Sequence, residues 1–415
     1  MDRREPDFVD ECYADKDLSQ LQKLTLVIPT YNRNYYLSRC LWYHAHFPFG
    51  EIIVADSSPE EKKAVNRETV AKIRSLFGVN IRYLEYKPET DKYGEDIYLK
   101  WADAIQQVKT EYTKISTDKE FLIPSRVLRC IQYLDENSDC QTADGTSILI
   151  RMNNDNFNSP HYDIWTPYDK SYLEDDMLSR VESSSRNPYG NLGQWNMLTA
   201  IRKTDFQKWI YNQLELHKLL DLRFGDALPQ LLSLVCSKRM HFSDTYLVRD
   251  LSAAYEKGGA VKKSESSASR YPGLLSYYCD GIMDNKISSL NRLIREIVYK
   301  SYHQECDSHE SLSEKIVDLF MTRMGFKYYN NPTISRIYSS RLVNYLYYHI
   351  VVPTNRHFQN IITTPVLSNS GVRQKIYSRD YVPLSRDVCP DKHLEIVNQV
   401  IWKTFEKHAP DEPII

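Results

Sequence analysis

The sequence has few of the features that identify several large enzyme classes. It contains only 13 glycines in 415 residues, and no G-x-x-x-x-G-K-[ST] or G-x-G-x-x-G motif follows a predicted strand. The G-x-S-x-G turn of many hydrolases is lacking, and so is the H-x-x-x-H spacing of zinc enzymes. The sequence therefore gives no support for a P-loop ATPase, a Rossmann-type dehydrogenase, a hydrolase with a G-x-S-x-G turn or a zinc enzyme.

Long apolar runs and a strong charge imbalance are lacking too. No run approaches the roughly 20 apolar residues of a membrane span, and the first twenty residues are polar and charged. The formal net charge is −2, which gives no reason to expect a nucleic-acid partner. The eight cysteines include no C-x-x-C pair, as is typical of buried thiols in a reducing compartment. We expect a cytoplasmic protein.

The composition is that of a globular protein with more than one unit. Hydrophobic residues make up 42% of the chain and charged residues 26%, and 415 residues exceed one ordinary core. The polar residues 1–22 predict an N-terminal arm, residues 23–252 an α/β domain, and residues 253–415 a mainly helical C-terminal region. A stretch rich in lysine, glycine and serine, after about residue 253, marks the boundary.

Strands and helices alternate in the first 120 residues. Continuous apolar runs predict buried strands at Leu24–Pro29 and Glu51–Ala55, and further strands follow at Val79–Tyr86 and Tyr112–Ser116. Helical spacing separates them, so the pattern predicts a doubly wound, mostly parallel sheet. Ligands of such sheets bind at the loops that leave the carboxyl ends of the strands. Here these loops are residues 30–33, 56–58 and 117–120.

Each of the first two loops carries side chains that suit a nucleotide. Tyr31 offers a face for stacking on a base, and Arg33 offers a positive charge for a phosphate. Asp56 can accept a hydrogen bond from the imino group of a pyrimidine. The local alternatives are that Thr30 caps the following helix and that Asp56 forms a turn.

The third loop carries two acids on either side of a base. Asp118 and Glu120 come at the end of the fourth predicted strand, separated by Lys119. Two carboxylates so placed can point into a crevice and share a divalent metal through oxygen ligands. Such an ion would neutralise a departing diphosphate. The alternative is that both are surface acids at the end of a loop.

Three stretches together carry a resemblance to a known family. They read LTLVIPTYNR, EIIVADSSPEE and YLKWADAIQQVKTEYTKISTDKEFLIPSRVLRCIQYLDENSDCQTADG. They resemble bacterial GT-A glycosyltransferases of the family 2 type, in particular those linked to capsule or O-antigen assembly. The resemblance covers about residues 23–250 and is tightest over residues 100–145.

The resemblance implies a GT-A fold, with a Rossmann-like, mostly parallel sheet, and a nucleotide-sugar donor. It implies a donor pocket formed by Thr30, Tyr31, Arg33, Asp56 and Asp118, with Asp118 on the ribose side. Glu120 is the implied acid on the metal side, where it shares Mn²⁺ or Mg²⁺ with Asp118. The departure is at the middle of the acidic triplet. Lys119 stands where the family tends to carry an aspartate, which puts metal affinity in question.

A second acid is implied farther along the chain. The family carries an acid at the start of a helix and a basic residue after the next strand, and Asp226 and Arg249 occupy these positions. An inverting transfer needs a carboxylate that takes the proton of the acceptor hydroxyl, and this is the role expected of Asp226. The alternatives are that Asp226 only caps its helix, or that Asp144 or His241 is the base.

Two further segments have open interpretations. The polar residues 153–195 predict an insertion on the acceptor side, whose tyrosines suit sugar rings, or else a surface excursion packed by its own aromatic residues. The tyrosine-rich segment Ser339–Val351 has two interpretations. It is expected to form either an interfacial helix near a membrane-bound acceptor or a buried core helix.

The sequence as a whole predicts a glycosyltransferase of surface polysaccharide biosynthesis, metal-dependent and inverting. Its expected partners are a nucleotide-sugar donor and a saccharide, glycolipid or glycan acceptor, with peripheral association at the inner face of the membrane. The alternative is a non-catalytic subunit that keeps the GT-A fold and binds a glycan or a nucleotide. The sequence gives no oligomeric state.

Overall fold

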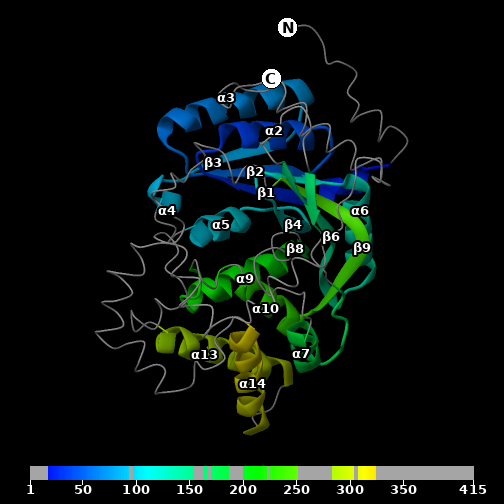
Figure 1. Ribbon diagram of the computed structural model, residues 1–415, viewed down its shortest axis with the longest axis vertical. Coiled ribbons are helices and arrows are strands. Elements are labelled where there is room, and N and C mark those ends of the chain that lie inside the picture. The colour runs from blue at the N-terminus through cyan, green and yellow to red at the C-terminus, as the bar shows by residue number, and fades with distance from the viewer. Residues whose placement is uncertain are drawn as a thin grey trace.

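The computed structural model describes residues 17–92, 97–152, 162–165, 170–186, 200–221, 225, 227–250, 283–302 and 307–323. The sheet lies at the centre of the α/β part, with α2 and α3 on one face and α5, α9 and α10 on the other (Figure 1). Helices α13 and α14 lie beyond α10, on the side away from the sheet (Figure 1). Residues 1–16 and the segment 339–351 are outside the described residues.

The nine strands of the sheet are β1 (Leu24–Thr30), β2 (Glu51–Asp56), β3 (Ile81–Glu85), β4 (Tyr112–Ile115), β5 (Glu120–Leu122), β6 (Cys140–Met152), β7 (Tyr162–Trp165), β8 (Ile201–Lys203) and β9 (Lys238–Asp250). The helices of the α/β part are α2 (Asn34–His44), α3 (Glu60–Phe77), α4 (Glu89–Lys92), α5 (Ile97–Gln106), α6 (Pro124–Glu136), α7 (Met177–Arg186), α9 (Thr204–Leu216) and α10 (Leu228–Cys236). A short 3₁₀ helix (Ser19–Lys23) precedes β1.

The strand order is β3-β2-β1-β4-β8-β6-β9-β5, with β7 paired to β6. The four strands from β3 to β4 are parallel, as the alternating pattern predicts. Strand β8 is antiparallel to both β4 and β6, whereas β6 and β9 run parallel to each other. The α/β fold class is confirmed, with a sheet that is parallel in its first half and mixed in its second.

Strand β1 shows why a continuous apolar run forms a central strand. Successive side chains point to opposite faces, so a strand covered by helices on both sides needs apolar residues at every position. Leu26 and Ile28 pack into the core beneath α2 and α3, whereas Val27 packs into the core beneath α5. All seven residues of β1 are buried.

The two described C-terminal helices share a core with the α/β part. Leu293 of α13 (Met283–Tyr302) and Phe320 of α14 (Asp307–Arg323) belong to the same cluster of buried residues as Val181, Ile210 and Leu231. These two helices therefore pack as part of the α/β core rather than apart from it. The mainly helical region expected over residues 253–415 stays a prediction, because most of it lies outside the described residues. Among the described residues, no helix combines the length and apolarity needed to cross a membrane.

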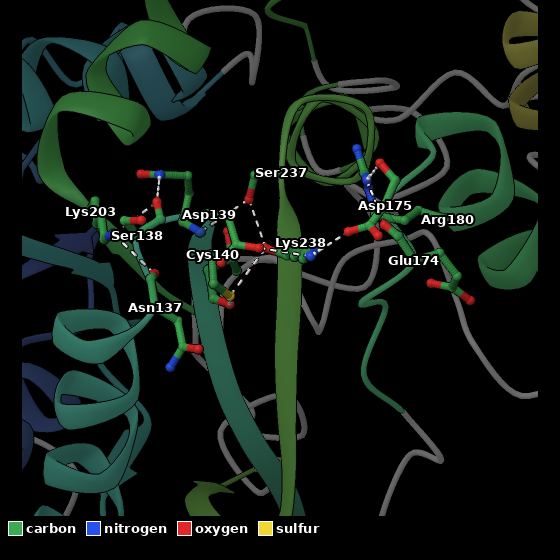
Figure 2. Close-up of polar contacts among 12 residues, drawn as sticks. Asn137, Ser138, Asp139, Cys140, Glu174, Asp175, Arg180, Lys203, Ser237 and Lys238 are labelled. Atoms are coloured by element: carbon green, nitrogen blue, oxygen red, sulfur yellow. Dashed lines mark hydrogen bonds and ion pairs between the residues drawn. The ribbon is translucent and has the colours of Figure 1, made fainter.

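The described part of the predicted insertion is folded onto the domain. Strand β7 pairs with β6, and Arg180 of α7 donates hydrogen bonds to the carbonyl oxygens of Leu234 and Val235 at the end of α10. Figure 2 shows this junction, where the Lys238 ammonium lies between the carboxylates of Asp139 and Asp175. Contact of this segment with an acceptor stays a prediction.

Candidate functional site

The loops after β1 and β2 are joined by hydrogen bonds at the carboxyl edge of the sheet. The backbone N–H of Asn32 donates to the Ser58 hydroxyl at 2.8 Å, and the backbone N–H of Ser57 donates to the Thr30 carbonyl at 3.3 Å. Asn32 has a φ of 55°, in the left-handed region, which asparagine adopts more readily than most residues. The chain therefore turns sharply after Thr30 and presents Tyr31 and Arg33 beside the second loop.

The third loop is fixed to the first through Asp118. The Thr30 hydroxyl donates to Oδ2 of Asp118 at 3.0 Å, and Nη1 of Arg33 donates to Oδ1 at 3.0 Å. The Asp118 carboxylate is buried, and the Arg33 side chain is 27% exposed. The structure thus brings Thr30, Arg33 and Asp118 together, as the sequence predicts, and closes all three loops into one cluster.

A buried lysine completes the junction, and sequence reasoning did not select it. Nζ of Lys100 donates to the Ser57 hydroxyl at 2.8 Å and lies 3.4 Å from the Thr30 carbonyl oxygen. The side chain comes from the apolar helix α5 and is 2% exposed. A lysine inside the run YLKWADAI was the available signal, because a buried ammonium needs a partner.

Asp56 is held by groups of its own chain. Its carboxylate accepts hydrogen bonds from the backbone N–H of Ser58 and from the Asn66 amide, both at 2.7 Å, and from the Tyr83 hydroxyl. Burial, and then the bond to Asp56, raise the pKa of Tyr83. Asp56 therefore fixes the end of β2 and the loop that follows, and its contact with a nucleobase stays a prediction.

Glu120 lies in a different environment from Asp118. It is the first residue of β5 rather than part of a loop, and it pairs with Arg249 of β9. Oε1 is 3.2 Å from Nη1 of Arg249, and Oε2 is 3.5 Å from Nζ of Lys114 and 3.1 Å from the backbone nitrogen of Thr117. Glu120 and Lys114 are both fully buried. The carboxylate thus lies between two basic side chains.

The contacts of Asp118 and Glu120 leave no free carboxylate oxygen at the predicted metal site. Both oxygens of Asp118 and both of Glu120 already accept hydrogen bonds or face cations. Among the described residues, no group of three or more His, Cys, Asp or Glu side chains could hold a metal ion. Burial lowers the pKa of Lys119 to about 7, and Arg249 and Arg33 act in the same direction. This set of side chains does not fit a divalent cation.

The two competing candidates for the base lie side by side. Nδ1 of His241 is 2.7 Å from Oδ1 of Asp144, and Nε of Arg239 donates to Oδ2 at 2.9 Å. Burial alone would raise the pKa of Asp144, but Arg239 and His241 hold it below its ordinary value. The Asp144 carboxylate is therefore a buried, ion-paired group with little capacity to take a proton.

Asp226 lies outside the described residues, but the residue before it is placed. A Cβ on Gly225 would come 2.4 Å from a carbon of the Tyr98 ring and 2.6 Å from the Asp221 carbonyl oxygen. Only glycine allows this approach of the chain to α5. Helix α5 also carries Lys100, which contacts the joined loops. The segment that leads into α10 therefore packs against the same helix as these loops.

Comparisons with known proteins give distant likenesses only. No protein-family model and no curated protein matches the sequence. Among solved structures, TarS 1-349 from S. aureus in complex with UDP-GlcNAc has a TM-score of 0.39 and 13% identity, covering 72% of this chain and 90% of that chain. Mannosyltransferase PcManGT from Pyrobaculum calidifontis, in complex with GDP-Man and Mn²⁺, has a TM-score of 0.37 and 9% identity, covering 86% of this chain and 88% of that chain.

Proposed function

We propose that this protein is a glycosyltransferase that uses a nucleotide-activated sugar. The observation that carries the proposal is the hydrogen-bonded junction of the loops after β1, β2 and β4, through Thr30, Asp118 and Lys100. It lies at the carboxyl ends of parallel strands, where α/β sheets bind ligands. The resemblance of residues 23–250 to GT-A glycosyltransferases, tightest over residues 100–145, supports the reaction class.

The side chains at this junction suit the parts of a nucleotide. Arg33 supplies a charge for a phosphate, and Tyr31, half-buried beside it, supplies a face for the base. In our proposal Asp118 lies on the ribose side, as the resemblance implies, and Thr30 and Arg33 hold its carboxylate in place. Asp56 keeps the second loop in place for the base.

The proposed reaction is an inverting displacement. The acceptor oxygen forms a bond to the anomeric carbon while the bond from that carbon to the diphosphate oxygen breaks, and the bonding electrons leave with the diphosphate. The proton of the acceptor hydroxyl passes to the carboxylate of Asp226, our candidate base. Asp226 is preferred because both oxygens of Asp144 are engaged by Arg239 and His241.

The acceptor follows from the resemblance alone. We propose a saccharide, glycolipid or glycan of surface polysaccharide assembly, reached by peripheral association with a membrane. Incubation of the protein with liposome-embedded and with soluble glycan acceptors would separate these possibilities, because a membrane-bound acceptor gives product only in the sedimented fraction.

The central test is transfer from a panel of nucleotide sugars, measured as release of nucleoside diphosphate. Asp226→Asn should lower kcat by about 10²–10⁴-fold, the usual worth of a positioned base, with donor Kd nearly unchanged. Asp144→Asn is the matched acid. Full activity in Asp226→Asn with loss in Asp144→Asn would move the base to Asp144. Donor binding by the wild type without turnover on any acceptor would support the non-catalytic subunit.

A further inference from the structure

The described side chains around the three loops carry an excess of positive charge. Three of them are acids: Asp56, Asp118 and Glu120. Five are basic: Arg33, Lys100, Lys114, Lys119 and Arg249. Basic groups therefore outnumber acids at this edge, although burial lowers the pKa of Lys114 and lowers that of Lys119 to about 7. An edge with this balance attracts a phosphate dianion and repels a divalent cation.

Two of the three acids of this cluster are already paired with basic side chains. Asp118 is paired with Arg33, and Glu120 lies between Lys114 and Arg249. A divalent ion prefers several oxygen ligands and would have to displace these cations from both carboxylates. For Glu120 this separation is costly, because Lys114 and Arg249 are buried with it and would be left without a compensating charge.

Lys119 differs from the other basic side chains of the cluster. It is 8% exposed, and its ammonium has no hydrogen bond or ion pair with any of the described residues. Arg33 and Arg249 are close enough to act on its charge, as are Asp118 and Glu120 on either side in the sequence. A nearly buried ammonium without a bonded partner is unfavourable. An anionic ligand at this edge would provide that partner.

We infer that Lys119 binds the diphosphate of the donor and that nucleotide binding needs no divalent metal. The inference rests on the proposed function, which places a nucleotide at this edge. Lys119 then supplies the positive charge that the sequence resemblance assigned to an ion held by Asp118 and Glu120. As the sugar leaves, the charge left on the diphosphate oxygen is met by this ammonium and by Arg33.

The test is calorimetric titration of the purified full chain with UDP and with GDP, in EDTA and in Mn²⁺. For the nucleotide that binds the wild type, Kd should agree within about threefold between the two conditions, a difference of less than 1 kcal/mol. Lys119→Gln should weaken binding about 10–100-fold in EDTA, the range of a hydrogen bond to a charged group. Lys119→Arg should keep most of the affinity because it keeps the charge.

Two further variants make the result specific. Lys109→Gln removes an exposed lysine elsewhere on the surface and should leave Kd unchanged. Lys119→Asp reverses the charge at this position, and its binding should fall further than that of Lys119→Gln in EDTA. Mn²⁺ should not recover it, because Glu120 stays paired with Lys114 and Arg249. Circular dichroism of each variant checks that a loss of affinity does not come from unfolding.

The outcomes separate this inference from the proposed function. Wild-type binding that requires Mn²⁺, or unchanged Kd in Lys119→Gln, overturns the inference while nucleotide binding still supports a transferase. Absence of binding to both nucleotides in both conditions counts against both. Binding in EDTA that depends on Lys119, without turnover on any sugar donor, would keep the inference and move the protein to the non-catalytic class.

Discussion

Asp118 and Glu120 are two residues apart, yet they belong to different regions of the molecule. Asp118 is at the loop edge, where it accepts from Thr30 and from an Arg33 side chain that is 27% exposed. Glu120 is in the interior, with its carboxylate between Lys114 and Arg249. Both carboxylates are buried, but Asp118 is held by the joined loops at the sheet edge, whereas Glu120 is held by basic groups in the interior.

The difference comes from one short strand. Glu120 opens β5, and the pairing of β5 with β9 sets its carboxylate against Arg249. Asp118 precedes that strand and stays with the loops. The comparison teaches that the acid–base–acid pattern need not mark a metal site, since a strand that begins within it divides the acids between an interior and an edge.

The largest expected effect is on stability, from Glu120→Gln. The change leaves Lys114 and Arg249 without a carboxylate partner in the interior, which costs about 3–5 kcal/mol of unfolding free energy for a broken buried pair. Urea denaturation followed by circular dichroism measures it. The double variant Lys114→Met, Glu120→Gln should recover part of the loss. A Glu120→Gln protein as stable as wild type that loses Mn²⁺-dependent turnover would instead make Glu120 a metal ligand.

Asp118→Asn should lower transfer activity strongly and stability only slightly. The unfolding free energy should fall by only about 1–2 kcal/mol, because Arg33 can still be solvated and the amide still accepts from Thr30. Transfer activity should be lost, since the first and third loops are no longer held by a charged pair. The measurements are the same denaturation series and nucleoside diphosphate release. Equal loss of stability in both acid variants would remove the distinction between the two regions.

A pH-dependent effect concerns a histidine beneath β5. His44 is fully buried, with Nδ1 donating to the Cys40 carbonyl at 2.8 Å and Nε2 accepting from the backbone N–H of Leu122 at 3.4 Å. This arrangement requires a neutral ring. Burial lowers the pKa of His44 from 6.5 to about 3.

The sign of the pH dependence follows from that shift. Below pH 6.5 the unfolded chain takes up a proton at His44 that the folded chain refuses until about pH 3, so stability falls as pH falls across this window. Between pH 6.5 and pH 5 the loss should be about 1.5–2 kcal/mol, given about 1.4 kcal/mol per pH unit. His44→Gln should show a correspondingly shallower slope. An identical slope in the variant would mean that other groups cause it.

The sequence predicted much of the fold because the relevant signals are local. The apolar run of β1 and the helical spacing of α3 and α5 each depend on neighbours within a few turns or pleats. The observed strand Leu24–Thr30 agrees closely with the expected Leu24–Pro29. Four parallel strands then place three loops at one edge, since alternating strands and helices leave few other arrangements. The contact of Arg33 with Asp118 follows from that edge.

Tertiary structure alone decided which partner each charged side chain has. Lys100 reaches Ser57 across 43 positions of sequence, and Arg249 reaches Glu120 across 129. No local pattern encodes such pairs, because they depend on which strands become neighbours. The sequence by itself determined the alternating elements and the loops that meet at the sheet edge. The pairing of β5 with β9 decided that Glu120 is buried among cations, because a carboxylate that leaves water needs basic groups or hydrogen-bond donors around it.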